Sequence, residues 1–433
     1  MAGLFWTSKS SFRLRHDRDT ARTGSRQGRG IVGAMTHAQR TAGSPPYTPA
    51  PYTPALDGLR GLAILGVLLF HTGHLPGGFL GVDLFFALSG YLITDLLLRE
   101  TDATGTVSLV AFWGRRVRRL LPALAAVLAA VTVLVWALAP PDLVRTTLAD
   151  GPWVPANLVN WHLLAESASY WDRFGPGRVF EHLWSIAVEE QFYLVWPVVL
   201  LLVARLRRRV HVRVAVIAIL ASAASLALMI TLADPADPTR VYTGTDTRAF
   251  SLLLGALVAT RPVRAALARV GTRAAGAVLA VAAAGLGVTW LFADGTTARW
   301  LYHGGLFGYA LAAALLIGLC AQAPDTPVAR ALAWRPLRHL GLVSYSLYLW
   351  HWPVFVLLSP RRGWAWTVAA CAVAIGLAVL SKYLVEDPIR FRARWARGRS
   401  GLLAFAALMI GLAAVWVALP APAPPTVDVA DLG

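Results

Sequence analysis

Apolar residues are gathered along this chain in runs of about 20 positions, separated by short polar and charged segments. A helix of that length crosses a hydrocarbon core of roughly 30 Å, because each residue adds about 1.5 Å. The pattern therefore predicts an all-α fold, a polytopic membrane helix bundle with about eleven transmembrane helices. The spans are expected at residues 56–75, 79–98, 120–140, 184–204, 212–233, 247–260, 274–292, 304–323, 341–359, 364–385 and 401–420.

Two segments fit this pattern less well. Residues 142–163 contain charged side chains and two prolines, so we expect an outer loop or a re-entrant element there. The sixth span, 247–260, is short for a full crossing, at about 14 residues.

The arginines predict the orientation of the bundle. With the N-terminus inside, most of them fall in the cytoplasmic segments 99–119, 205–211, 261–273, 324–340 and 386–400, and few fall outside. Cytoplasmic loops of membrane proteins carry such an excess of Lys and Arg. Counting 142–163 as a span would invert every later loop and remove the bias. We therefore predict a multi-pass protein of the cell membrane, with the N-terminus inside and the C-terminus outside.

Composition agrees with a membrane protein and argues against a soluble domain and against a nucleic-acid-binding protein. Hydrophobic residues make up 57% of the chain and charged residues 15%, against roughly 25% charged in soluble domains. The net charge of +17 could suggest nucleic acid, but the arginines lie between apolar runs, so no nucleic-acid partner is expected. Cys320 and Cys371 lie inside apolar runs without metal-ligand spacing, so no metal site is expected.

The chain divides into four parts. Residues 1–54 are polar and rich in Arg, Ser, Gly and Pro, which predicts a disordered cytoplasmic tail. Residues 55–400 hold the first ten spans and form the main membrane domain. Residues 401–420 are an extra eleventh span, and residues 421–433 are a short Pro-rich outer tail.

The first span carries two ionisable residues on one face. His71 follows Arg60 by eleven positions, which at about 100° per residue is a net turn of roughly 20°. Arg60 is then near the cytoplasmic edge, with His71 about 16 Å farther into the membrane. Arg60 could snorkel to the interface, and His71 could simply bond another helix. Together on one stripe, they indicate a catalytic site.

The fourth span carries two adjacent carboxylates. Glu189 and Glu190 point about 100° apart, so at least one must face the bundle interior. Glu189 is expected at a depth similar to that of His71, because the two helices run in opposite directions. A carboxylate beside a histidine orients the ring and raises its basicity. We predict that Glu189 or Glu190 orients His71; the alternative is an ion pair with an arginine such as Arg248.

Spans two and six supply further candidates for substrate binding or structural support. Asp83 is either an interfacial charge or the partner of a cation in the site. Ser89 and Tyr91 flank a glycine that allows close helix packing. Arg248 stands at a helix start, where the macrodipole disfavours a cation, so it is expected to pair with a carboxylate.

Span nine and the segment before span three complete the set. Tyr348 and His351 lie among aromatic residues that either line a channel for an acyl chain or simply pack. The basic run with Arg115, Arg116 and Arg118 is expected in a cytoplasmic loop. It is either a topology signal alone or a site for the phosphates of a cytoplasmic donor, since guanidinium groups match phosphate oxygens.

Seven motifs, in one order, resemble the acyltransferase 3 family of membrane-bound O-acyltransferases. They span about residues 55–390, and the order makes the set specific where each motif alone is weak. The motifs are LDGLRGLAILGVLLFH, GVDLFFALSGYLIT, FWGRRVRRLLP, HLWSIAVEEQFYLVWP, YTGTDTRAF, SYSLYLWHWP and VEDPIR.

The resemblance implies a ten-span catalytic domain that moves an acyl group, often acetyl, from cytoplasmic acyl-CoA. The implied acceptor is a hydroxyl of a carbohydrate or a glycosylated molecule. The family's Arg–His pair matches Arg60 and His71, and its arginine motif matches Arg115, Arg116 and Arg118. No permanently bound cofactor is implied; acyl-CoA is a co-substrate.

The acceptor stays open at this point. Many relatives carry an outer hydrolase-like domain after an eleventh span, whereas this sequence ends shortly after residue 420. Polysaccharides and macrolide sugars are therefore both possible acceptors.

The predicted mechanism is direct transfer. His71 deprotonates the acceptor hydroxyl, Arg60 and the basic run hold the donor, and His71 could alternatively carry the acyl group transiently. The rival hypothesis is a transporter or flippase of a sugar or lipid, although the paired broken helices typical of transporters are not evident.

Overall fold

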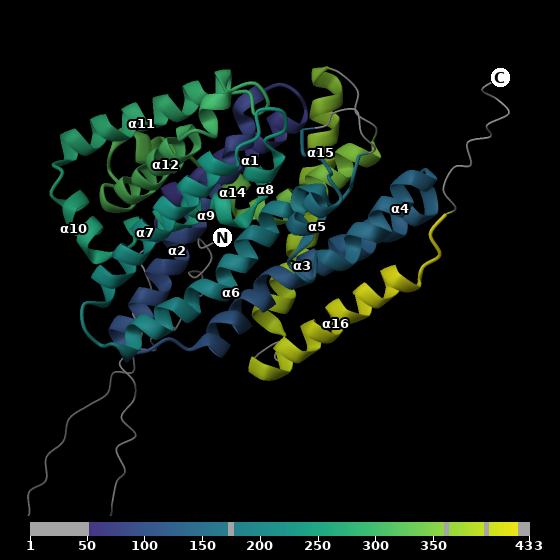
Figure 1. Ribbon diagram of the computed structural model, residues 1–433, viewed down its shortest axis with the longest axis horizontal. Helices are drawn as coiled ribbons and strands as arrows, with labels where there is room; N and C mark the ends of the chain where they lie inside the picture. The colour runs from purple at the N-terminus through teal and green to yellow at the C-terminus, as the bar shows by residue number, and fades with distance from the viewer. Residues whose placement is uncertain (1–51, 172–176, 359–362, 394–397, 423–433) are drawn as a thin grey trace, which may run out of the picture.

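The computed structural model describes residues 52–171, 177–358, 363–393 and 398–422, and these ranges contain helices and no strand. The predicted tails fall almost entirely outside them. Figure 1 shows the helices gathered into one bundle, with most of the long helices running side by side. The long helices are α1 Pro54–His71, α2 Gly81–Thr104, α3 Leu109–Leu138, α6 Trp184–Arg205, α7 Val210–Leu232, α9 Thr245–Val258, α11 Thr272–Phe292, α12 Gly305–Gln322, α14 Arg335–Leu357, α15 Trp364–Ser381 and α16 Gly398–Ala418.

The prediction of a polytopic membrane bundle is confirmed. In the described part of the chain, ten helices are long and apolar enough to cross a membrane. The number becomes eleven if α9 is joined to α10 (Arg261–Ala268), which is bent from it by 65°. The short sixth span is thus α9, with 14 residues. The inside-to-outside orientation stays a prediction from the arginines.

Residues 142–163 do not cross the bundle as one helix. They form α4 (Pro141–Asp150) and most of α5 (Val159–Ala165), joined by a 3-10 turn. Helices of 10 and 7 residues are too short to span a bilayer. The expectation of a non-spanning element is confirmed. The other short helices are α8 Thr239–Thr243 and α13 Pro327–Leu332.

The start of the third long helix differs from the prediction. The basic run was expected in a loop before residue 120, but α3 already begins at Leu109 and includes the run. The Ser108 side chain caps the helix by accepting from the Ala111 amide at 3.4 Å. Trp113 donates from Nε1 to the Tyr193 carbonyl at 3.0 Å, which ties this part of α3 to α6. The arginines therefore project from a packed helix.

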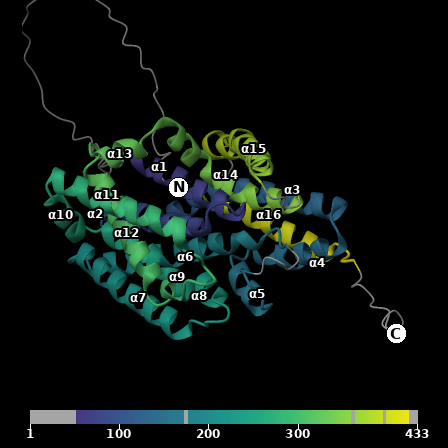
Figure 2. The same cartoon turned by 90° about the horizontal axis from the view of Figure 1, so that it is seen from above.

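Two helices lie at the centre of the bundle and one at its edge. In α1, 67% of the most apolar 18-residue stretch is buried inside the protein, and in α2 with its preceding turn the share is 83%. In α16 the share is 22%. Figure 1 shows α16 alongside α3 at one side of the molecule, and Figure 2 gives the view at right angles. Trp416 of α16 donates to Thr132 of α3 at 2.7 Å, so the extra span is docked on the main bundle.

The central helices meet their neighbours backbone to backbone. A Cβ atom on Gly341 of α14 would lie 1.8 Å from the Asp57 carbonyl oxygen of α1, and one on Gly61 would lie 2.0 Å from the Leu337 carbonyl oxygen. Helices in membranes associate closely at such glycines. The contact between α1 and α14 sets the position of every side chain near it.

Replacing the glycine at this contact should destabilise the bundle. In Gly341→Ala the added methyl group overlaps a backbone oxygen, so we expect a loss of about 1–3 kcal/mol. The measurement is the thermal unfolding midpoint of the purified protein in detergent.

The matched control is Gly376→Ala in α15, where an added Cβ meets no atom within 4 Å. Its midpoint should stay the same or rise, because alanine favours a helix. Equal midpoints for the two variants would contradict the proposed contact.

Candidate active site

Three histidines from distant parts of the chain meet in the bundle. His71 is the last residue of α1, His351 lies in α14, and His182 lies in the 3-10 turn that precedes α6. Nδ1 of His71 lies 3.1 Å from Nε2 of His351. The rings of His182 and His351 are 5.4 Å apart, edge to face. His351 and His182 are buried, whereas His71 is partly exposed.

The surroundings of His71 are aromatic. The Trp352 ring lies 4.7 Å from the His71 ring, and the Tyr170 hydroxyl lies 3.5 Å from Nε2 of His71. Trp352 is itself held, because its Nε1 donates to the Arg178 carbonyl at 2.8 Å. His71 thus has one nitrogen bound to another histidine and the other beside a hydroxyl group.

Neither glutamate of α6 orients His71, contrary to the prediction. Glu189 instead accepts hydrogen bonds from the hydroxyl groups of Ser89 and Tyr193. Glu190 is partly exposed and lies within electrostatic range of Arg116. The depth estimate failed because His71 lies at the very end of α1, where the turn before α6 places His182 rather than Glu189.

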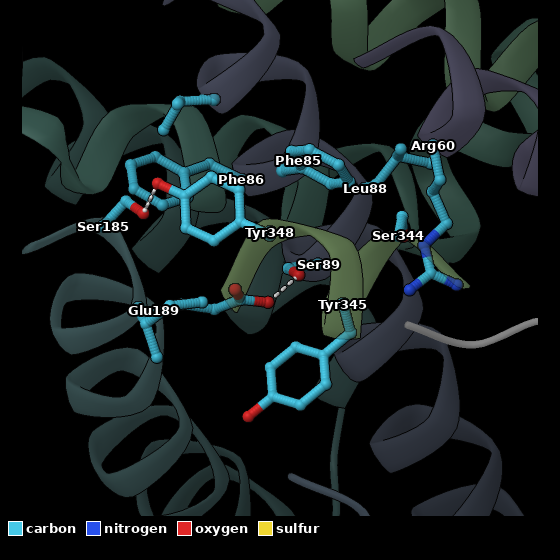
Figure 3. Close-up of a pocket in the computed structure, with 12 residues that line it drawn as sticks. Arg60, Phe85, Phe86, Leu88, Ser89, Ser185, Glu189, Ser344, Tyr345 and Tyr348 are labelled. Carbon is cyan, nitrogen blue, oxygen red and sulfur yellow. Dashed lines mark hydrogen bonds between the residues drawn. The ribbon is translucent and has the colours of Figure 1, made fainter. Parts of the chain in front are cut away.

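A narrow pocket is lined by Glu189 and by Tyr348, whose ring contacts His182 and His351. It has a volume of about 20 Å³, enough for about one water molecule. Figure 3 shows Arg60 on one side of this pocket and Glu189 on the other, with Tyr348 near Ser185. The Tyr348 hydroxyl lies 2.6 Å from the Ser185 hydroxyl and donates to the His182 carbonyl at 2.9 Å. We call this space the central pocket; its other lining residues are Val82, Phe85, Phe86, Leu88, Ser89, Ile186, Ser344 and Tyr345.

Arg60 is buried, with 3% of its surface exposed. Its guanidinium group lies 3.7 Å from the Asp57 carboxylate, and its Nε has no hydrogen-bond partner among the described residues. Snorkelling to the surface is thus excluded, and Arg60 supplies positive charge at the central pocket.

Arginines line a second, larger cavity of about 170 Å³. Buried Arg116 stacks on the Phe112 and Tyr193 rings, with its Cζ 5.6 and 5.2 Å from their centres. In the described part of the chain, one terminal nitrogen each of Arg116 and Arg119 lacks a hydrogen-bond partner. We call this space the arginine cavity; its lining residues are Leu96, Phe112, Arg115, Arg116, Arg118, Arg119, Arg390 and Phe391.

The sequence analysis did not single out three of these residues as site residues. Arg119 ends the basic run, one helical turn after Arg115 and Arg116, so the helical spacing of the run could have identified it. Arg390 stands in the VEDPIR motif, and the π-helical turn Pro388–Arg392 brings it to the cavity. His182 opens the motif HLWSIAVEEQFYLVWP, and only the fold brings it beside His351.

Asp83 and Arg248 form a separate buried pair. Both side chains are fully buried, their charged groups are 2.7 Å apart, and Ser251 also donates to Asp83 at 2.8 Å. Arg248 therefore pairs with a carboxylate, as predicted, and this pair ties α2 to α9. Tyr91 is buried in α2 but is not among the lining residues of either cavity.

The family model described as "Acyltransferase domain" matches residues 53–383, and this range includes all three histidines and four of the five cavity arginines. The chain belongs to the acyltransferase 3 family. Among the described residues of this acyltransferase 3 protein, no group of three or more His, Cys, Asp or Glu side chains is arranged to hold a metal ion. No solved structure matches the chain.

Curated relatives of this acyltransferase 3 protein are bacterial. The chain is 38% identical over 353 residues to YrhL of Bacillus subtilis, provisionally named a peptidoglycan O-acetyltransferase, with 78% of this chain and 55% of YrhL covered. It is 34% identical over 350 residues to the peptidoglycan O-acetyltransferase OatA of Listeria monocytogenes, with 78% and 56% covered. It is 34% identical over 357 residues to the O-acetyltransferase OatA of Staphylococcus aureus, with 79% and 58% covered. The chain thus spans about half the length of the curated relatives it matches.

Breaking the buried pair of α2 and α9 should destabilise this acyltransferase 3 protein. Asp83→Ala leaves the Arg248 guanidinium buried without its carboxylate, which costs about 3–5 kcal/mol. The double variant Asp83→Leu with Arg248→Met should recover much of that loss, because it removes both charges. Thermal unfolding in detergent measures both.

The exposed pair of Asp142 and Arg145 gives the control. Asp142→Ala should cost less than about 1 kcal/mol. A single variant at Asp83 that unfolds no earlier than the double variant would contradict a structural role for the pair.

Proposed function

We propose that this chain is a membrane O-acetyltransferase. It moves an acetyl group from cytoplasmic acetyl-CoA to a hydroxyl group of a carbohydrate. The observation that carries the proposal is a series of polar and aromatic side chains between the arginine cavity and His71.

The series begins at Arg116, whose guanidinium stacks 5.2 Å from the Tyr193 ring. The Tyr193 hydroxyl donates to Glu189, which lines the central pocket together with Tyr348. The Tyr348 ring lies 5.2 Å from the His351 ring, and His351 contacts His71. A donor anchored at one end of this series could present its thioester near the other end.

The arginine cavity fits the phosphates of the donor. Five guanidinium groups gather there. Nearby carboxylates include Glu100, 3.4 Å from Arg115, and Glu386, 3.6 Å from Arg390, and Glu189 and Glu190 lie within electrostatic range of Arg116. Uncompensated buried charge is costly, so such a cluster is stabilised by an anion. An arginine guanidinium group can donate two parallel hydrogen bonds to two oxygens of one phosphate group. The positive-inside pattern predicts that this end of the bundle faces the cytoplasm, the side from which the proposed donor would enter.

The position of His71 supports direct transfer as the proposed mechanism. His71 takes the proton of the acceptor hydroxyl, and the oxygen attacks the thioester carbonyl carbon. The new ester C–O bond forms as the C–S bond breaks, and the thiolate of CoA takes the proton back from His71. General-base help of this kind is worth roughly 10² to 10⁴ in rate. Transient acetylation of His71 is the alternative route to the same products.

Arg60 supports the reaction from the central pocket. Its buried positive charge lies beside the path between the donor cavity and the histidines, so it can orient a polar group of the donor arm. Since the pocket has room for about one water molecule, the arm can enter only if lining side chains move aside.

Relatives favour a glycan as the acceptor, because two of them are named peptidoglycan O-acetyltransferases. We propose a peptidoglycan-type sugar hydroxyl as the first acceptor to test, with a macrolide sugar as the comparison. Purified protein in proteoliposomes, given acetyl-CoA labelled in the acetyl group and peptidoglycan fragments, should acetylate the glycan. Movement of sugar across the vesicle without label transfer would instead support a transporter.

Removing the base should abolish transfer. His71→Gln should lower the rate by about 100-fold or more, because the acceptor hydroxyl loses its proton acceptor. The rate of label transfer from acetyl-CoA measures this. The control is His303→Gln, an exposed residue whose ring bonds only the Arg299 carbonyl. A His71 variant with near-normal transfer would overturn the mechanism.

Weakening the arginine cavity should affect the donor alone. Arg116→Gln with Arg119→Gln should raise the KM for acetyl-CoA by about 10-fold or more with little change in kcat, because bonds between charged groups contribute about 1.5–3 kcal/mol each. Steady-state kinetics measure the two constants.

Exposed Arg299→Gln is the matched control and should leave the KM for acetyl-CoA unchanged. An unchanged KM in the double variant would place the donor phosphates elsewhere.

A further inference from the structure

The orientation of His351 is fixed by a backbone carbonyl. Its Nδ1 lies 2.7 Å from the carbonyl oxygen of Tyr348, one turn earlier in α14. A carbonyl oxygen can only accept a hydrogen bond, so Nδ1 of His351 must carry a hydrogen. In a neutral imidazole the other nitrogen then has a lone pair and no hydrogen. Nε2 of His351 is therefore a hydrogen-bond acceptor.

This constraint passes to His71. Nε2 of His351 faces Nδ1 of His71 at 3.1 Å, and two lone pairs cannot bond each other. Nδ1 of His71 must then be the donor and carry the hydrogen. A neutral His71 consequently has its lone pair on Nε2, the nitrogen 3.5 Å from the Tyr170 hydroxyl.

We propose that His351 is a positioning residue that holds His71 in the Nδ1–H tautomer and so keeps Nε2 free as the base. The proposal rests on the proposed function for its catalytic meaning, but the tautomer itself follows from the geometry. When Nε2 takes the acceptor proton, the Nδ1–H bond to His351 is kept. The proton leaves again from Nε2 to the thiolate, so the pair returns to its starting state.

The fold protects this arrangement. The glycine contact between α1 and α14 fixes the two helices that carry the histidines. Trp352 packs against the His71 ring, and Phe355 lies 5.7 Å from the His351 ring, edge to face. With both rings packed, neither histidine can turn over to exchange its two nitrogens without displacing these neighbours.

A neutral partner and a carboxylate would affect the protonated form of His71 differently. A carboxylate would hold the protonated form of His71 by charge attraction, which is strong in a low-dielectric interior. A neutral imidazole fixes the tautomer and supplies only a dipole. Beside a neutral imidazole, His71 therefore binds a proton less tightly than it would beside a carboxylate. In the proposed mechanism this eases the transfer of the proton to the thiolate.

Kinetics of two His351 variants test the positioning role. His351→Leu removes the acceptor, so kcat should fall about 10- to 100-fold, a part of the roughly 10² to 10⁴ that a general base contributes. KM for acetyl-CoA should change little. His351→Gln should recover most of the rate, because its amide oxygen can reach the position of Nε2 and accept from His71.

His339→Leu is the matched control, since it removes an exposed histidine of the same helix α14. It should stay within about two-fold of the wild-type kcat. Equal losses in His351→Leu and His351→Gln, or a loss expressed only in KM, would overturn the proposal.

Nitrogen NMR tests the tautomer without any activity. The full-length protein labelled with ¹⁵N-histidine in lipid should show His71 with a protonated Nδ1 and an unprotonated Nε2, assigned by comparison with His71→Gln. In His351→Leu the two His71 tautomers should become mixed. The opposite tautomer in the wild type would overturn the proposal even if acetyl transfer is found, whereas the expected tautomer without acetyl transfer would overturn only the proposed function.

Discussion

The close approach of α1 and α14 is the constraint on which the rest of the site depends. Two glycines let the helix backbones touch, with a Cβ on Gly341 placed 1.8 Å from the Asp57 carbonyl oxygen. In a bilayer no hydrophobic effect drives helices together, so packing of small residues must supply the contact. Because Gly61 of α1 and Gly341 of α14 touch, the two helices are held in a fixed register along their length. That register brings His71 and His351, which follow these glycines along their helices, to 3.1 Å across 280 residues of sequence.

Buried charges in this bundle fall into two classes with different meanings. Asp83 and Arg248 neutralise each other at 2.7 Å, although Oδ2 of Asp83 and two nitrogens of Arg248 have no hydrogen-bond partner among the described residues. In the arginine cavity five guanidinium groups gather, and Arg116 and Arg119 each keep one unpartnered terminal nitrogen in the described part of the chain. The balance of charge therefore distinguishes the one-to-one pair, which links two helices, from a cluster that can bind an anion.

The sequence predicted the spans well because hydropathy over about 20 residues is a strong signal. It predicted side-chain partners and helix ends less well, because these depend on how each helix is rotated and on the exact residue at which it begins or ends. The start of α3 was misplaced because its arginines look like a loop, although Phe112 is fully buried beneath them. Glu189 was assigned to His71 from depth alone, yet it bonds Ser89 and Tyr193. The partner of His71 comes from another helix, and no spacing along the chain reveals that.

Polar groups inside a membrane protein must be satisfied in a medium without water, and this requirement leads to the histidine pair. A carboxylate beside His71 would need its own partners and would fix a charge in the site. A second histidine, anchored on the Tyr348 carbonyl, leaves the site neutral. In the proposed mechanism, a positive charge appears only while His71 holds the acceptor proton. A low-dielectric site would then favour the return of that proton to the departing thiolate, the last step of the proposed transfer.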